Sequence, residues 1–152
     1  MYIYKNQYES ISYLQDQSQN FLSWICPLLK QIYVPMDQYI YQESDQIVEI
    51  YFVTRGYCGF VLPLGKNVVY IAVNQGDFFG EIDFVFEAQQ ADLEISNLVQ
   101  YYSYHDKNFN LIRHFTIQAI TDCHFLAIDI DNLVRMNQQF NSQFNQMFGQ
   151  AI

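Results

Sequence analysis

Hydrophobic residues change their spacing near residue 30 and again near residue 130. Up to residue 30, apolar residues recur at helical spacing, which predicts a helix or a helix pair over residues 2–19 and a further helix over residues 20–30 with Asn20 as its N-cap. Beyond residue 30, short runs of β-branched and aromatic residues are separated by turn residues, a pattern typical of strands. We expect these strands near residues 31–35, 39–42, 50–55, 57–63 and 67–73.

Residues 88–110 interrupt this pattern. They are acidic, then tyrosine-rich, then polar, with no sustained period, so we expect a long and largely unstructured insertion loop. Alternation resumes over residues 111–121, and the last strand is predicted over residues 123–129. Asp129 or Asp131 then caps a helix at the C-terminal end.

The pattern as a whole predicts a mainly β fold with flanking helices. Short antiparallel strands at this spacing indicate a jelly-roll-like β-roll, a double-stranded β-helix of about eight strands, with helices at the N- and C-terminus. The expected divisions are a helical lead-in, the β-roll with its insertion at 88–110, and a C-terminal helix region: residues 1–30, 31–130 and 131–152. The residues expected in the core are Phe52, Phe60, Ile71, Phe79, Ile117 and Leu126.

Composition narrows the classes of function. A chain of 152 residues with 51% hydrophobic and 18% aromatic residues is long and apolar enough for one folded domain. The net charge of -9, with only 7 Lys and Arg residues, disfavours a nucleic-acid surface. Three widely spaced cysteines favour reduced thiols over disulfides or a metal site. We expect no signal peptide and no membrane-spanning segment in this chain.

The clearest candidate chemistry lies in one stretch, QGDFFGEIDF at residues 75–84. Gly76 and Asp77 follow an apolar run and predict a turn out of a strand. Gly80 permits a backbone conformation that other residues resist, and the bare amides of such a turn can hold an anion. The neighbouring carboxylate of Glu81 can accept hydrogen bonds from sugar hydroxyls.

This stretch resembles the phosphate-binding cassette of cyclic nucleotide-binding domains, whose pattern is G-D-x-F-G-E, then small and apolar residues, then an arginine. The resemblance covers roughly residues 20–145, and the chain is similar to the domains of cyclic-nucleotide-gated and hyperpolarisation-activated cation channels. The flanking runs that are similar to the family's strands are YVP at 33–35, YIYQESD at 39–45, IYFVTRG at 50–56, RHFTIQA at 113–119 and TDCHFLAID at 121–129.

The resemblance implies a ligand site for cyclic AMP or cyclic GMP. Arg113 would hold the exocyclic phosphate oxygens, Glu81 would bind the ribose 2′-hydroxyl, and His114 stands where the family has a residue that influences purine choice. The implied ligand-binding residues are Phe79, Gly80, Glu81, Ile82, Asp83, Arg113 and His114. From the residues alone, Arg113 can equally be an edge-strand arginine in solvent or one paired with a cassette acid, and Glu81 can be a helix N-terminal carboxylate.

Asp83 is the main departure from the family pattern, which has a small apolar residue at this position. A carboxylate beside a bound phosphate repels it unless the carboxylate turns outward or pairs. At an effective dielectric constant near 20, two unit charges about 6 Å apart repel by roughly 3 kcal/mol. If Asp83 points into the cassette, we therefore expect nucleotide binding to be weak or absent, and Asp83→Ala to create or strengthen it.

Two functions remain open from the sequence. The first is a regulatory cyclic nucleotide sensor, the cytoplasmic module of an ion channel or other signalling protein, held at the inner face of a membrane by a parent channel and forming homo-oligomers through that parent. The second is a degenerate cyclic nucleotide-binding-like fold that binds no nucleotide and serves as a structural or protein-interaction module. Neither is an enzyme, because no motif for a nucleophile or a metal site is present, and neither uses a cofactor or nucleic acid.

Overall fold

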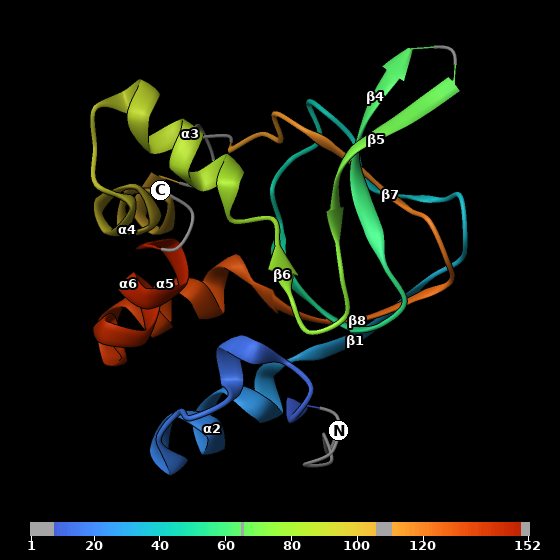
Figure 1. Cartoon of the computed structure of the whole chain (residues 1–152). Coiled ribbons are helices and arrows are strands. Elements are labelled where there is room, and N and C mark those ends of the chain that lie inside the picture. The colour runs from blue at the N-terminus through green and yellow to red at the C-terminus, as the bar shows by residue number, and fades with distance from the viewer. Residues whose placement is uncertain (1–7, 65, 106–110, 150–152) are drawn as a thin grey trace.

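The computed structural model describes residues 8–64, 66–105 and 111–149. Figure 1 shows a β-roll on one side and a group of helices on the other. The strands are β1 (Lys30–Val34), β2 (Tyr39–Tyr41), β3 (Glu49–Arg55), β4 (Cys58–Leu64), β5 (Lys66–Val73), β6 (Phe78–Phe79), β7 (Thr116–Ala119) and β8 (Cys123–Asp129). The helices are η1 (Ser12–Leu14), α2 (Gln19–Ile25), η2 (Cys26–Leu28), α3 (Ile82–Ala91), α4 (Ile95–His105), α5 (Ile130–Gln139) and α6 (Asn141–Gly149).

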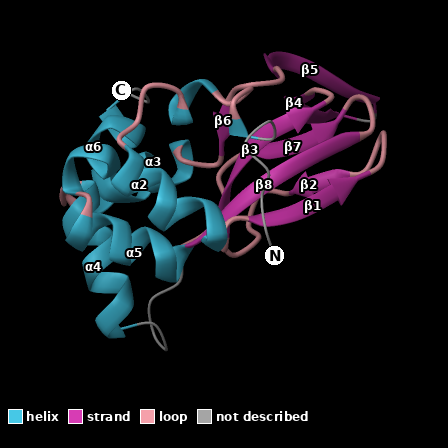
Figure 2. Cartoon of the chain, turned by 90° about the horizontal axis from the view of Figure 1, so that it is seen from below, coloured by secondary structure: helices cyan, strands magenta, loops and turns pink. Residues whose placement is uncertain are grey.

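The strands form two four-stranded antiparallel sheets, which confirms the predicted β-roll with helices at both ends. The strand order is β1-β8-β3-β6 in one sheet and β2-β7-β4-β5 in the other. Apart from β4 and β5, which pair with each other in one sheet, consecutive strands along the chain alternate between the two sheets. Figure 2 shows the helices gathered at one end of the strands. Among the described residues, no helix is long and apolar enough to cross a membrane.

Two apolar clusters hold the domain together. The first cluster joins the helices to the outer face of the β1-β8-β3-β6 sheet and contains Phe52 and Leu126. The second cluster fills the space between the two sheets and contains Phe79 and Ile117. These four of the six predicted core residues are buried as expected. Phe60 is only half-buried and Ile71 is 53% exposed. The prediction for Ile71 is wrong because β5 is an edge strand and its alternating residues lack a covering layer.

The predicted insertion loop is wrong over residues 88–105. The first part of this segment continues α3 to Ala91, and most of the remainder forms α4. Leu98 and Val99 of α4 are fully buried in the cluster that joins the helices to the sheet. With Ile95 and Tyr102 they recur at i, i+3, i+4 and i+7, a helical period that the acidic and polar residues between them obscure. Residues 106–110 lie outside the described residues.

Of the predicted helix N-caps, one is confirmed and one is wrong. The side chain of Asp129 accepts a hydrogen bond from the Asn132 amide, which confirms it as the N-cap of α5. The N-cap of α2 is Ser18 and not Asn20, because the Ser18 hydroxyl accepts from the Phe21 amide. Of the predicted lead-in, residues 1–7 lie outside the described residues.

Candidate functional site

Gly80 shapes the turn between β6 and α3. Its φ of 101° lies in the region that favours glycine. A Cβ added there would lie 3.4 Å from the Glu49 carbonyl oxygen and 3.3 Å from Nη1 of Arg113. The glycine therefore lets the turn approach both groups closely. Glu81 follows as the N-cap residue of α3, and α3 begins at Ile82.

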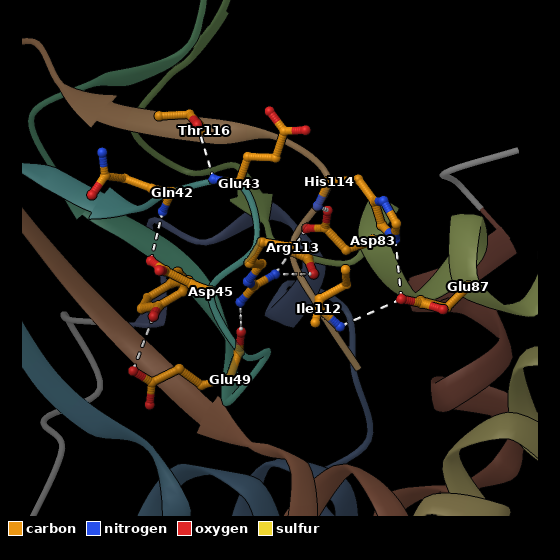
Figure 3. Close-up of polar contacts among 12 residues, drawn as sticks. Gln42, Glu43, Asp45, Glu49, Asp83, Glu87, Ile112, Arg113, His114 and Thr116 are labelled. Carbon is orange, nitrogen blue, oxygen red and sulfur yellow. Dashed lines mark hydrogen bonds and ion pairs between the residues drawn. The ribbon is translucent and has the colours of Figure 1, made fainter. Parts of the chain in front are cut away.

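Arg113 lies at the centre of the site and is 1% exposed. Its Nη1 donates to the Gly80 carbonyl oxygen at 2.8 Å and to Oδ2 of Asp83 at 3.0 Å, and its Nη2 donates to the Glu49 carbonyl oxygen at 2.6 Å (Figure 3). The guanidinium also lies 3.8 Å from the centroid of the Tyr41 ring. These contacts occupy both ends of its planar fork. Only Nε of this side chain lacks a partner among the described residues.

Arg113 does not lie on a strand as expected, and its surroundings distinguish between the two roles that the sequence left open for it. It lies in the irregular segment before β7, not on a strand, because β7 begins only at Thr116. It is not an edge arginine in solvent. It is paired with a cassette acid, the second of the two readings that its residue type left open.

Asp83 is fully buried and makes this pairing. Its Oδ2 accepts from Arg113, and its Oδ1 accepts from the His114 amide at 2.6 Å. Burial raises the pKa of the Asp83 carboxyl, and the His114 amide and the Arg113 guanidinium oppose that rise. Both carboxylate oxygens are thus used inside the protein. Asp83 turns toward Arg113, where its charge is compensated, and not outward to solvent.

His114 also contacts α3, through a different acid. Its Nε2 lies 3.1 Å from Oε1 of Glu87, and its ring lies 4.2 Å from that of Phe86. The same Glu87 oxygen accepts from the Ile112 amide at 3.4 Å (Figure 3). Asp83 and Glu87 therefore fasten one side of α3 to residues 112–114.

Glu81 contrasts with its neighbour Asp83. It is half-buried, and its Oε2 has no hydrogen-bond partner among the described residues. Burial, reinforced by the nearby Asp83 charge, raises the pKa of Glu81 to about 7. Glu81 borders a pocket of about 400 Å³ that is also lined by Phe60, Ile71 and Phe79. Neither Arg113 nor Asp83 lines this pocket, so the paired charges are not reached from it.

The remaining predicted residues have packing roles. Phe79 is buried, and its ring stacks on that of Tyr51 with centroids 5.0 Å apart. Ile82 is half-buried in the first turn of α3. Among the described residues, no group of His, Cys, Asp or Glu has an arrangement that could hold a metal ion.

Sequence reasoning missed Tyr41 and Glu49. Glu49 gives its carbonyl oxygen to Arg113, while its carboxylate accepts from the Tyr51 hydroxyl at 3.0 Å and pairs with Lys30 at 2.9 Å. Both residues lie more than sixty positions before Arg113. Tyr41 lies in the YIYQESD run, which carried no ligand role, and Glu49 lies in none of the family-like runs. No local signal in the sequence connects them to the site.

Comparison with known proteins identifies the fold. No protein-family model and no curated protein matches the sequence. The structure is similar to a cyclic nucleotide-binding protein from Geobacter metallireducens GS-15, with a TM-score of 0.64 and 12% identity over 98% of this chain and 92% of that one. It is also similar to the C-linker/CNBHD of zELK channels, with a TM-score of 0.61 and 15% identity over 91% of this chain and 59% of that one.

The chain therefore has the fold of a cyclic nucleotide-binding domain, similar to the domains of channels. One of the two similar structures is named for cyclic nucleotide binding and the other for a channel module.

Proposed function

We propose that this domain is a structural or protein-interaction module that works without cyclic nucleotide, because its phosphate site is closed from within. One observation carries the proposal: Arg113 forms a fully buried ion pair with Asp83. Arg113 is the residue that the family resemblance assigns to the phosphate. The Asp83 carboxylate takes hydrogen-bonding positions on the guanidinium that a phosphate would need. A nucleotide would have to displace it.

The energy of that displacement is large enough to decide the function. Breaking a buried ion pair by removing one partner costs about 3–5 kcal/mol, because the other charge stays buried without compensation. Micromolar binding corresponds to about −8.2 kcal/mol, and each 1.4 kcal/mol changes affinity about tenfold. The displacement therefore weakens a micromolar site to roughly the millimolar range.

A cyclic AMP or cyclic GMP sensor is the second candidate, and specific observations favour it. Gly80 keeps the left-handed backbone of the cassette turn, and a buried oxygen of Glu81 has no partner among the described residues. One of the similar structures comes from crystals grown in the presence of cAMP. In this function the domain is the regulatory part of a channel or other signalling protein in the cytoplasm, and the nucleotide opens the Asp83–Arg113 pair.

Calorimetric titration with cyclic AMP and cyclic GMP separates the two functions. We expect no binding to the wild type at micromolar concentrations. Asp83→Ala removes the internal competitor and should create or strengthen binding, provided that circular dichroism shows a folded domain. Asp131→Ala, which removes an exposed acid from α5, is the matched control and should not bind. Micromolar binding by the wild type would overturn the proposal in favour of the sensor.

A further inference from the structure

The outer face of the β1-β8-β3-β6 sheet changes character at its far end. Ile128 and Leu126 of β8 are buried on this face, in the cluster that joins it to the helices. The next residue on the same face, His124, is exposed. The helical layer therefore covers only part of the face and leaves the end near His124 open to solvent.

Three side chains from three neighbouring strands gather at this uncovered end. Tyr33 of β1 lies opposite His124 of β8, and Arg55 of β3 lies opposite it on the other side. The Tyr33 and His124 rings are 5.0 Å apart between centroids, and all three residues are exposed. Strand β8 lies between β1 and β3 in this sheet, so the three residues form a row across it.

A β-bulge places Arg55 in this row. The β3–β8 register runs regularly to Val53 opposite Phe125 and then shifts, so that Arg55 and not Thr54 lies opposite His124. Without the shift, Arg55 would face the interior of the β-roll. The Thr54 hydroxyl donates to the His124 carbonyl oxygen at 2.9 Å and fixes the bulge. Bulges often re-aim a side chain in this way next to functional sites.

The row borders a pocket of about 710 Å³, and none of the described residues that line it is acidic. Its lining also includes the apolar residues Ile32, Phe125 and Leu126. Arg55 forms no ion pair among the described residues, although the chain as a whole carries a net charge of -9. Within the described part of the chain, the surroundings of Arg55 therefore differ from the acidic character of the protein as a whole. Its fork, the imidazole nitrogens and the Tyr33 ring suit an anion on a flat apolar group.

We propose that Tyr33, Arg55 and His124 form a binding site for a small organic anion, in which a phosphate or carboxylate group pairs with Arg55 and His124 and an aromatic group packs against Tyr33. The site lies on the outer face of the sheet, whereas Arg113 is buried in the cassette region. It is independent of the proposed function, since neither Asp83 nor Arg113 lines it.

Titration followed by amide resonance shifts tests this site, with phenyl phosphate and benzoate as probes and benzyl alcohol as their neutral counterpart. We expect both anions to bind at millimolar concentration and to shift resonances of β1, β3 and β8, while benzyl alcohol does not. The ratio of the two affinities tells which anionic group the site prefers. No shift with either anion, or equal shifts with benzyl alcohol, would overturn the proposal.

Arg55→Gln should weaken phenyl phosphate binding by about tenfold or more, the range for a lost hydrogen bond to a charged group. Arg135→Gln is the matched control, because Arg135 is exposed on α5 and does not line the pocket. Equal losses in the two variants would mean non-specific attraction and would reject the site. The shifts are read at the amides of Tyr33, Arg55 and His124, which lie outside the Asp83–Arg113 site, so the result is independent of the cyclic nucleotide titration.

Discussion

Arg113 and Arg55 are both carried by the β-roll, but their surroundings are opposite. Arg113 is buried and donates to two carbonyl oxygens and one carboxylate. Arg55 is exposed beside a pocket whose lining, among the described residues, contains no acid. The arginine that the family resemblance marks for phosphate is thus the less accessible of the two. A sequence motif thus specifies residue types and their order. Whether a ligand can reach one of these residues depends on the partners that the fold places beside its side chain.

The largest expected effect comes from breaking the buried pair. Asp83→Leu or Arg113→Met alone should lower the free energy of unfolding by about 3–5 kcal/mol, because each leaves an uncompensated buried charge. The double variant Asp83→Leu/Arg113→Met should lose far less than the sum of the single variants. Urea denaturation of all the variants measures this coupling. Losses that simply add would mean that the two side chains do not act as a pair.

The second-largest effect is expected for the packing of α4 behind the Asp83–Arg113 site. Leu98 of α4 is fully buried, and α4 packs against α3, which carries Asp83. Leu98→Ala should lower the free energy of unfolding by about 2–5 kcal/mol through lost burial and a cavity. Tyr101→Ala, on the exposed face of the same helix, should change it far less. If chemical denaturation showed equally small losses of stability in both variants, residues 95–105 would be only loosely attached, as the sequence had predicted for the insertion.

Glu81 is half-buried, between the buried Arg113 and the exposed Arg55, and it makes the stability of the domain depend on pH. Its pKa rises from the ordinary value of 4.5 to about 7 in the folded state. Between these values the folded state holds a proton that the unfolded state has released, so stability falls as pH rises. The full fall is at most about 3 kcal/mol, at 1.36 kcal/mol per pKa unit.

Glu81→Gln tests this linkage, because glutamine does not titrate. The variant should show a flatter stability profile between pH 5 and pH 8 than the wild type, measured by urea denaturation across that range. Glu43→Gln, at an exposed site, is the control and should keep the slope of the wild type. A wild-type stability that rises over this interval would contradict the raised pKa.

The smallest expected effect belongs to Arg55. Arg55→Gln should change the free energy of unfolding by no more than about 0.5 kcal/mol, since the side chain is exposed and forms no ion pair among the described residues. Thermal melting beside the Arg113→Met variant gives the direct comparison. A loss as large as that of Arg113→Met would show that Arg55 supports the fold, and the difference between the two arginines would disappear.

The sequence by itself determined the elements that depend on local chemistry. Strand alternation predicted the β-roll, and the glycine at position 80 predicted the turn that approaches Arg113. Asp129, one of the two predicted caps, marks the start of α5. These features follow from backbone preferences and nearby hydrogen bonds, which a few neighbouring residues settle.

Only the tertiary structure decided burial and partners. Alternation shows which residues share a face of a strand, but Phe52 is covered and Ile71 is open because one strand is central and the other lies at an edge. Asp83 and Arg113 are thirty residues apart, and a carboxylate in the cassette was equally compatible with facing solvent. Long-range contacts fixed its direction, because a buried charge is stable only where the folded chain supplies its counter-charge.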